Sequence, residues 1–321
     1  MKKILVLAAG LLQIPVIRKA RDMGYWVIAA DGDPTAEGLR LADKAVVADI
    51  TSEEKMLAVA REERIDAVIH PCSEVSMTVM GRINDELGLS GISRETARRA
   101  TNKHLMREAF EANGAPSPRS WCTTSADEAW HIFKDGMQTA AILKPSRNSG
   151  SRGIAKVTRS LSEKSFKNLY QRALLESRDA SVMLEQFVEG PEFSVEIIVW
   201  KGVPHVLTVT DKKTTGAPYF VEIGHNQPSL FPEETVRLVA EAACCGVRAL
   251  GLDACAAHAE VKVQDENPYL MEVGARLGGD FISTSLAHLS TGIDMVSAAI
   301  SVAFGEEPDL TPKTPSQGVC I

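Results

Sequence analysis

A loop of small residues that follows a lysine is the sharpest chemical feature of the sequence. Residues 142–154, ILKPSRNSGSRGI, join one expected strand to the next. Gly150 and Gly153 tolerate positive φ, so backbone N–H groups can close over an anion, and Lys144 adds a fixed charge at the root of the loop. The pattern predicts a phosphate cradle, although an ordinary surface hairpin with a solvated lysine fits the same residues. It is not a Walker A loop, because no G-x-x-x-x-G-K-[ST] string occurs.

A second candidate site lies where the strand expected at 181–186 ends, within VMLEQFVEGPE at residues 182–192. A carboxylate and a free backbone N–H at a strand end can pair with the amine and ring nitrogen of adenine. A second carboxylate, five to seven residues further on, can accept hydrogen bonds from ribose hydroxyls. The alternative is a solvated glutamate beside a turn, which is the more common place for a surface Glu.

Two acidic residues lie on strands expected near the end of the chain, in AHAEVK at 257–262 and YLMEVGAR at 269–276. Because successive side chains of a strand point to opposite faces of the sheet, Glu260 and Glu272 each point to one defined face. If the two strands are neighbours, both carboxylates can point into one site. Paired carboxylates are costly without a cation between them, and Mg²⁺ takes such oxygen ligands beside nucleotide phosphates. The alternative is a pair of acids that face solvent.

A glycine pair follows at Gly278 and Gly279, where a helix is expected to open. Backbone donors at a helix N-terminus can bind an anionic substrate group. The alternative is a helix start with a flexible lead-in.

The elements that would position these residues begin with alternating strands and helices. The strands are expected at 3–7, 25–30 and 66–70, and the helices between them at 12–23 and 52–63. Continuous apolar strand runs separated by helices predict a doubly wound parallel sheet. Residues 93–113 are expected to be helical with a break near Thr101, and the Pro-containing segment 115–118 marks a linker.

A second and a third unit are expected after this linker. Strands are predicted at 139–144, 154–157 and 181–186 with helices at 125–134 and 161–175, and then strands at 192–200, 203–210, 253–263 and 269–273. Residues 211–229 are interpreted as a loop rich in Lys, Thr, Gly and Pro, and 232–250 as a helix.

In this order the pieces resemble the ATP-grasp superfamily of carboxylate–amine ligases. The resemblance covers nearly the whole chain and includes five motifs between Lys103 and Arg276. It implies an α/β fold: an N-terminal doubly wound parallel-sheet domain at 1–93, followed by a two-lobed α+β ATP-grasp domain. Its N-terminal lobe with a lid would occupy 94–187 and its C-terminal lobe 188–321.

The resemblance also implies roles for individual residues. Lys103 and Lys144 would bind the nucleotide phosphates, and the lid would contribute Ser149, Gly150, Ser151 and Gly153. Glu185, Gln186 and Val188 would form the adenine hinge, and Glu192 would bind the ribose. Glu260 and Glu272 would hold Mg²⁺, or Mn²⁺ in its place. Arg276 would neutralise an acyl phosphate, and the substrates would meet Arg276, Gly279, Glu74, Lys212 and His225.

Two departures from the family pattern stand out. Gly274 occupies the position of the asparagine in E-x-N-x-R, which removes one metal ligand. The chain also stops at Ile321, where similar proteins continue, so a truncated or a naturally short form is expected.

The resulting hypothesis is an ATP-dependent ligase that activates a carboxylate as an acyl phosphate and joins it to an amine. The segments at 190–196, 224–229 and 276–280 resemble amino-acid ligases and carbamoyl-phosphate-synthetase-like proteins. The alternatives are a bicarbonate-activating or carbamoyl-forming enzyme, and a nucleotide-binding regulatory protein without catalysis. An NAD-dependent oxidoreductase is disfavoured, because only Gly10 stands where G-x-G-x-x-G needs three glycines.

The amino-acid composition limits the classes of partner that the chain is expected to bind. The 321 residues contain 45% hydrophobic and 24% charged residues and carry a net charge of -7, which gives no general affinity for nucleic acid or anionic lipid. No apolar stretch approaches the ~18 residues of a membrane helix. The six cysteines contain no C-x-x-C pair, which predicts neither zinc ligation nor disulfides and favours the cytoplasm. The expected partners are small carboxylates and amines, and a homodimer is the expected assembly.

Overall fold

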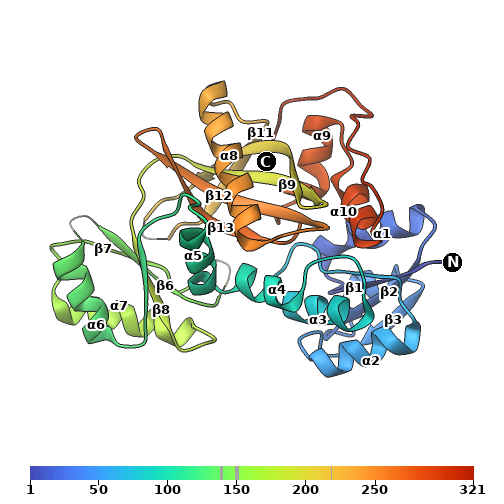
Figure 1. Cartoon of the computed structure of the whole chain (residues 1–321), viewed down its shortest axis with the longest axis horizontal. Helices are drawn as coiled ribbons and strands as arrows, with labels where there is room; N and C mark the ends of the chain where they lie inside the picture. Colours follow the sequence, from blue (N-terminus) through green and yellow to red (C-terminus); the bar gives the residue numbers. More distant parts are fainter. Residues whose placement is uncertain (138–139, 149–151, 218) are drawn as a thin grey trace.

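Three β-sheets organise the part of the chain that the computed structural model describes, residues 1–137, 140–148, 152–217 and 219–321. In Figure 1 the first sheet lies at the lower right, the second at the left and the third above and between them. Their mixed parallel and antiparallel pairing confirms the predicted α/β class.

The first sheet is parallel throughout and has the order β3-β2-β1-β4. Its strands are β1 (Lys3–Leu7), β2 (Trp26–Asp31), β3 (Lys44–Val47) and β4 (Ala67–Ile69). Successive residues of β1 enter opposite cores, Ile4 with α1 (Ile14–Asp22) and Leu5 with α2 (Glu53–Glu63) and α3 (Met77–Leu87). This two-sided burial explains the continuous apolar run and confirms the doubly wound sheet. β3 is absent from the sequence prediction, because it has only four residues and three of them are exposed.

Two helices connect the first sheet to the rest of the chain. They are α4 (Arg94–Thr101) and α5 (Lys103–Ala112). Asn102 separates them with an extended backbone, and its side chain accepts hydrogen bonds from the backbone N–H groups of His104 and Leu105. This N-cap confirms the predicted break near Thr101 and places Lys103 in the first turn of α5.

The second sheet is antiparallel and has the order β5-β8-β6-β7. Its strands are β5 (Ser120–Thr123), β6 (Ala141–Pro145), β7 (Ala155–Val157) and β8 (Val182–Gln186). A small core packs it against α6 (Ala126–His131), which continues into a wide helical turn at Ile132–Gly136, and α7 (Glu163–Glu176).

The third sheet is also antiparallel and has the order β13-β12-β9-β10-β11-β14. Its strands are β9 (Glu192–Trp200), β10 (Val203–Thr214), β11 (Glu222–Gln227), β12 (Cys255–Gln264), β13 (Asn267–Gly274) and β14 (Val319–Cys320). The long helix α8 (Glu233–Leu250) packs against it. The predicted loop at 211–229 is wrong at both ends, because β10 continues to Thr214 and β11 begins at Glu222.

The last helices lead back to the first sheet. The helix expected to open at Gly278 and Gly279 begins only at Ile282, because Asp280 and Phe281 have φ of 48° and 58° and form a turn before it. A wide turn at Ile282–Leu286 leads to α9 (Ala287–Thr291), and α10 (Met295–Ala303) packs beside α1. Short helical turns also occur at Leu11–Gln13 and Glu37–Arg40.

Among the described residues, no single helix combines the length and apolar composition needed to cross a membrane. The segments Ile282–Thr291 and Met295–Ala303 meet that test only together, across a bend of 119°.

Candidate active site

A cavity of about 330 Å³ lies between the second and third sheets. Strands of both sheets line it, together with α5 and the segment after β4. The predicted site residues that line it are Glu74, Lys103, Lys144, Glu185, Val188, Glu192, Lys212, Glu260, Glu272, Arg276 and Gly279. The structure thus brings together groups that span some 200 residues of sequence, from Glu74 to Gly279.

Two buried lysines form the cationic end of this cavity. Lys144, on β6, has its Nζ 2.8 Å from Glu185 Oε2. Lys103 donates to the carbonyl of Asn148 at 2.9 Å and lies 3.3 Å from the carboxylate of Glu272. Burial lowers the pKa of Lys144, with Glu185 opposing the shift. Burial acts in the same direction on Lys103, but Glu272 and Glu74 outweigh it and raise the pKa of that ammonium.

Glu185 does not present a free carboxylate to the cavity. Its oxygens accept hydrogen bonds from Arg107 at 3.0 and 3.2 Å, in addition to the ion pair with Lys144. Burial favours the neutral acid, but the two cations prevail and hold the pKa of Glu185 at about 2. The contact between this carboxylate and adenine stays a prediction: Glu185 lines the cavity, and its oxygens would accept from the adenine amine in addition to the two cations.

A free backbone donor does occur at the end of β8. The N–H groups of Gln186, Phe187 and Glu189 are bound to Arg119 O, Ala140 O and Gln264 Oε1. Over the described ranges, the N–H of Val188 has no such partner. Val188 and Phe187 line the cavity, so this edge can meet a flat ring with a hydrogen-bond acceptor. Gln186 is not among the lining residues.

The two acids expected at a metal lie opposite each other. Glu260 on β12 and Glu272 on β13 are register partners, so their side chains share one face of the sheet. Each carboxylate meets a lysine: Glu260 lies 2.9 Å from Lys212, and Glu272 lies 3.3 Å from Lys103. Carboxylate oxygens on one face of a sheet are suitable donors for a hard divalent cation. The donor set thus fits Mg²⁺ or Mn²⁺ at Glu260 and Glu272.

Gly274 gives room to Arg276. A Cβ at Gly274 would lie 3.3 Å from Cγ and 3.4 Å from Nε of Arg276. The Arg276 side chain is half-buried, lies 3.0 Å from Glu74 and donates to the carbonyl of Leu277. Burial and the charge of Glu272 raise the pKa of Glu74, while Arg276 opposes the shift. Gly274, which stands where the family pattern has asparagine, therefore lets the Arg276 side chain lie close to the backbone at this position.

Lys212 lies among three carboxylates. Its Nζ is 3.0 Å from Glu192, 2.9 Å from Glu222 and 2.9 Å from Glu260. Burial disfavours the ammonium, but these carboxylates raise the pKa of Lys212 well above its ordinary value. Because Lys212 lies on β10 rather than in a loop, its side chain is fixed inside the sheet, where it joins the expected ribose and metal carboxylates.

His225 lies beside the cavity and not among its lining residues. It belongs to β11, and its Nε2 is 3.5 Å from Glu222 and 3.8 Å from Asp280, both of which line the cavity. The sequence analysis names His225 but misses these two carboxylates.

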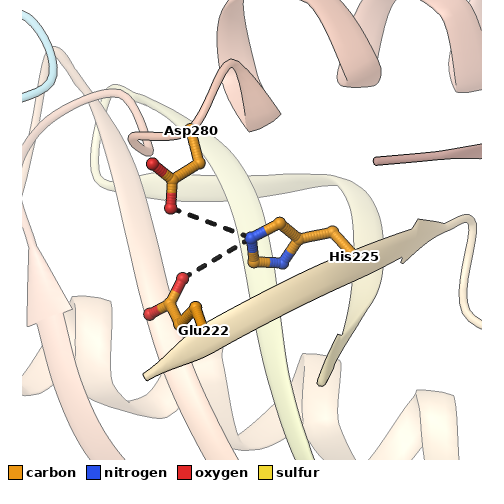
Figure 2. Close-up of side chains that lie close together, drawn as sticks. All are labelled: Glu222, His225 and Asp280. Atoms are coloured by element: carbon orange, nitrogen blue, oxygen red, sulfur yellow. Dashed lines mark ion pairs between the residues drawn. The ribbon is translucent and has the colours of Figure 1, made fainter. Parts of the chain in front are cut away.

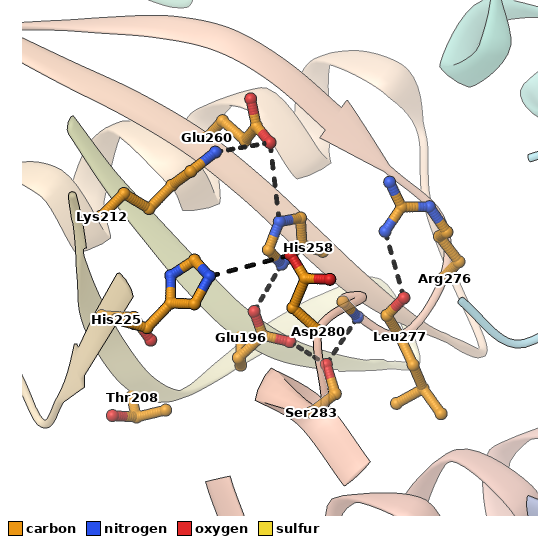
Figure 3. Close-up of polar contacts among 12 residues, drawn as sticks. Glu196, Thr208, Lys212, His225, His258, Glu260, Arg276, Leu277, Asp280 and Ser283 are labelled. Carbon is orange, nitrogen blue, oxygen red and sulfur yellow. Dashed lines mark hydrogen bonds and ion pairs between the residues drawn. The ribbon is translucent and has the colours of Figure 1, made fainter. Parts of the chain in front are cut away.

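A buried polar network supports the floor of the cavity (Figure 3). Glu196 accepts hydrogen bonds from His258, at 2.5 Å, and from Ser283, whose oxygen accepts from Gly278 N–H at 2.6 Å. Burial disfavours the imidazolium, but Glu196 raises the pKa of His258 to about 9. A charged residue inside the apolar run of β9 was the available sequence signal for Glu196, and the sequence analysis does not use it.

The predicted lid is only partly described. Ser149, Gly150 and Ser151 lie outside the described residues. Gly153 has φ of 73°, which favours glycine, and it does not line the cavity itself. Its neighbours Arg152 and Ile154 do.

Comparisons with known proteins agree with this geometry. Residues 137–285 match the family model of the ATP-grasp domain. The alanine–anticapsin ligase of Bacillus subtilis (strain 168) is 27% identical over 278 residues, which cover 80% of this chain and 58% of the ligase. Human carnosine synthase 1 is 30% identical over 139 residues, 43% of this chain and 17% of the synthase.

The same fold occurs in a solved enzyme. The crystal structure of an L-amino acid ligase from Bacillus licheniformis superposes with a TM-score of 0.82 at 22% sequence identity, covering 97% of this chain and 78% of that one. The chain spans between 51% and 60% of the length of the curated relatives that match most of it.

Proposed function

From the ATP-grasp domain that this chain carries, we propose that it is an ATP-dependent carboxylate–amine ligase. One observation carries the proposal: two buried lysines and two register-paired carboxylates, contributed by separate sheets and α5, line the same cavity. Such a cavity offers positive charge to phosphates and oxygen ligands to the cation that accompanies them. The curated relatives that form amide bonds point to the same class of reaction.

ATP would lie with its base against the edge formed by Phe187 and Val188, where the free N–H of Val188 can donate to a ring nitrogen. Glu192 at the start of β9 would accept from the ribose. Lys144 and Lys103 would face the phosphates. The lysines need no rearrangement of the backbone, because the sheet and α5 already fix their positions.

We propose that Glu260 and Glu272 hold Mg²⁺, or Mn²⁺ in its place. The ion would supply charge neutralisation between the phosphates and these carboxylates. Lys212 and Lys103, which neutralise the two acids in the described structure, would then share them with the ion.

The reaction proceeds in two steps. A carboxylate oxygen of the first substrate attacks the γ-phosphorus, and the bond from that phosphorus to the β–γ bridging oxygen breaks, giving an acyl phosphate and ADP. An amine then attacks the acyl carbon, phosphate departs and the nitrogen loses a proton. Arg276 and Gly279 N–H would bind the carboxylate and its phosphate, as electrostatic partners fixed in advance.

The acceptor side is proposed to include Glu74, Lys212 and His225. Glu74 lines the cavity and lies 3.0 Å from Arg276, so its carboxylate would bind the substrate amine beside the cation that binds the acyl phosphate.

A phosphate-release screen tests the proposal. The protein is incubated with ATP, Mg²⁺ and amino acids, singly and in pairs, with and without bicarbonate. We expect phosphate release that requires a carboxylate and an amine together and does not require bicarbonate. Release that depends on bicarbonate would instead identify a bicarbonate-activating enzyme. ATP binding without turnover across the panel would identify a nucleotide-binding regulatory protein.

Two further proposals concern the protein's surroundings. A homodimer and a cytoplasmic location remain expectations from the sequence, the latter because its six cysteines form no pair motif. Sedimentation velocity of the purified chain tests the first, and fractionation of cells tests the second.

A further inference from the structure

Three side chains, Glu222, His225 and Asp280, meet at the edge of the cavity, and the ligase proposal uses only His225 among them (Figure 2). Glu222 and His225 come from β11, and Asp280 comes from the turn before the wide helical segment at Ile282–Leu286. One potential ligand atom from each lies within 4.8 Å of the other two. Nε2 of the imidazole faces both carboxylates, at 3.5 Å from Glu222 Oε2 and 3.8 Å from Asp280 Oδ2.

These separations are those of ligands around an ion. They exceed the ordinary N–H···O length of 2.7–3.2 Å, so the imidazole is not simply hydrogen-bonded to either acid. Ligands that surround a four-coordinate ion at ~2.0–2.2 Å lie about 3.4 Å from one another. The cluster therefore has nearly the spacing of three ligands of one ion before the ion draws them together.

The state of His225 is an independent indication. The residue is 3% exposed, and its Nδ1 is buried without a hydrogen-bond partner among the described residues. A buried imidazole normally makes at least one hydrogen bond. The other nitrogen, Nε2, faces the two acids, so a cation bound there would give this buried ring a polar partner that, in the described part of the chain, it lacks at Nδ1.

The charge around the cluster also favours a cation. Oε1 of Glu222 lies 2.9 Å from Lys212, but this lysine also serves Glu192 and Glu260. Glu260 also lies 3.8 Å from His258, and the single ammonium is left between Glu192 and Glu222. Asp280, whose side chain is 63% exposed, adds a fourth negative charge to this part of the cavity.

We propose that Glu222, His225 and Asp280 form a binding site for a divalent transition-metal ion, separate from the nucleotide-associated cation. One imidazole nitrogen with carboxylate oxygens suits Zn²⁺, Co²⁺ or Mn²⁺ better than Mg²⁺, which favours oxygen and water. Neither Glu260 nor Glu272 belongs to the set, so the site does not require ATP.

The proposed site has room for further ligands. Glu222 and Asp280 both line the cavity, and three protein ligands leave at least one coordination position for water or for a substrate oxygen or nitrogen. An ion held here would present that position at the cavity edge, next to the acceptor side.

Co²⁺ titration of the metal-stripped full chain, without nucleotide, tests the site through the visible absorption of the bound ion. We expect one equivalent to bind with a spectrum of nitrogen and oxygen ligands, distinguishable from the thiolate charge-transfer bands that a cysteine site would give. Asp280→Asn should weaken binding at least tenfold. This exposed position is chosen because its change leaves the buried histidine in place.

Two control variants distinguish the proposed metal site from an exposed histidine and from the nucleotide-associated site. His131→Asn removes an imidazole from an exposed His131–Asp135 pair at 4.0 Å and should bind as the unmodified chain does. Glu272→Gln damages the nucleotide-associated site and should also retain the tight Co²⁺ site. The proposal is overturned if no Co²⁺ binds, if Asp280→Asn binds with unchanged affinity, or if Glu272→Gln alone abolishes binding.

Discussion

Lys144 acts both in the fold and in the cavity. Its Nζ pairs with Glu185, and Arg107 makes two hydrogen bonds to the same carboxylate. Removal of the lysine therefore leaves Glu185 with a partner. The proposed phosphate contact, by contrast, has no substitute at this position of β6.

We expect Lys144→Met to lower ATP-dependent phosphate release by two or more orders of magnitude while the chain stays folded. The expected loss follows from removing a fixed charge from the transferring phosphate, where such groups contribute about 3 kcal/mol or more. Steady-state kinetics and circular dichroism measure the two quantities. Lys164→Met, at an exposed position of α7, is the control. Near-normal turnover in Lys144→Met would remove the lysine from the mechanism.

At the scale of elements, His70 follows β4 and makes hydrogen bonds to the end of β1 and to the residue before α3. Its Nδ1 donates to Leu7 O at 2.9 Å, and its Nε2 accepts from Ser76 N–H at 3.3 Å. This pair of bonds requires the neutral ring. Burial lowers the pKa of His70 from 6.5 to about 4, because a charged ring would be desolvated.

The free energy of unfolding should therefore fall as the pH drops from about 6.5 to 4. Over that interval the unfolded chain binds a proton at His70 that the folded chain excludes, and the loss amounts to about 3 kcal/mol at most. Urea denaturation at a series of pH values measures it. His70→Asn should show a shallower dependence in the same interval, and the exposed His131→Asn an unchanged one. Equal slopes in all three proteins would refute a neutral buried His70.

Gly190 lets the chain pass close to β12 between β8 and β9. It has φ of 124°, and a Cβ there would lie 2.1 Å from Val263 O. Gly202 also has positive φ, 72°, but nothing lies within 4 Å of its Cβ position. Both glycines have positive φ, but only Gly190 has another backbone segment against its Cβ position.

Gly190→Ala should therefore destabilise the chain more than Gly202→Ala. The backbone penalty of ~1–2 kcal/mol applies to both, and the clash adds at least about 2 kcal/mol at Gly190. Chemical denaturation compares them. If the two variants lose equal stability, the close approach at Gly190 has no energetic weight.

The sequence predicts elements best where one pattern dominates. The buried run of β1, the break near Thr101 and the long helix α8 are all local signals, and the structure confirms them. β3 is missed because it is short and mostly exposed, and β11 because it is mostly polar and carries no apolar alternation. Sheet pairing, not local propensity, holds them in place.

In the candidate site, too, local sequence patterns reveal some residues, and only the folded structure reveals the others. Lysines and acids in motifs can be found by type and order, as Lys144 and Glu272 were. Partners such as Arg107 for Glu185, or Asp280 for His225, lie 78 and 55 positions away and are set only by packing. The pairing of the Glu185 carboxylate with Arg107 could not be found from the sequence for that reason.

At the scale of the whole molecule, the cavity depends on three parts of the chain. The segment after β4 contributes Glu74, the second sheet Lys144, and the third sheet Glu260 and Glu272. Helix α10 returns from the C-terminal part to pack beside α1, which fixes the first sheet against the rest. The chemistry proposed here needs all three parts in their described positions.

A crystal structure of the chain with Mg²⁺ and a non-hydrolysable ATP analogue tests this account most directly. The account predicts the base beside Val188, the phosphates within hydrogen-bond reach of Lys103 and Lys144, and the ion bound to both Glu260 and Glu272. A nucleotide bound outside the cavity, or an ion that contacts neither acid, would contradict it.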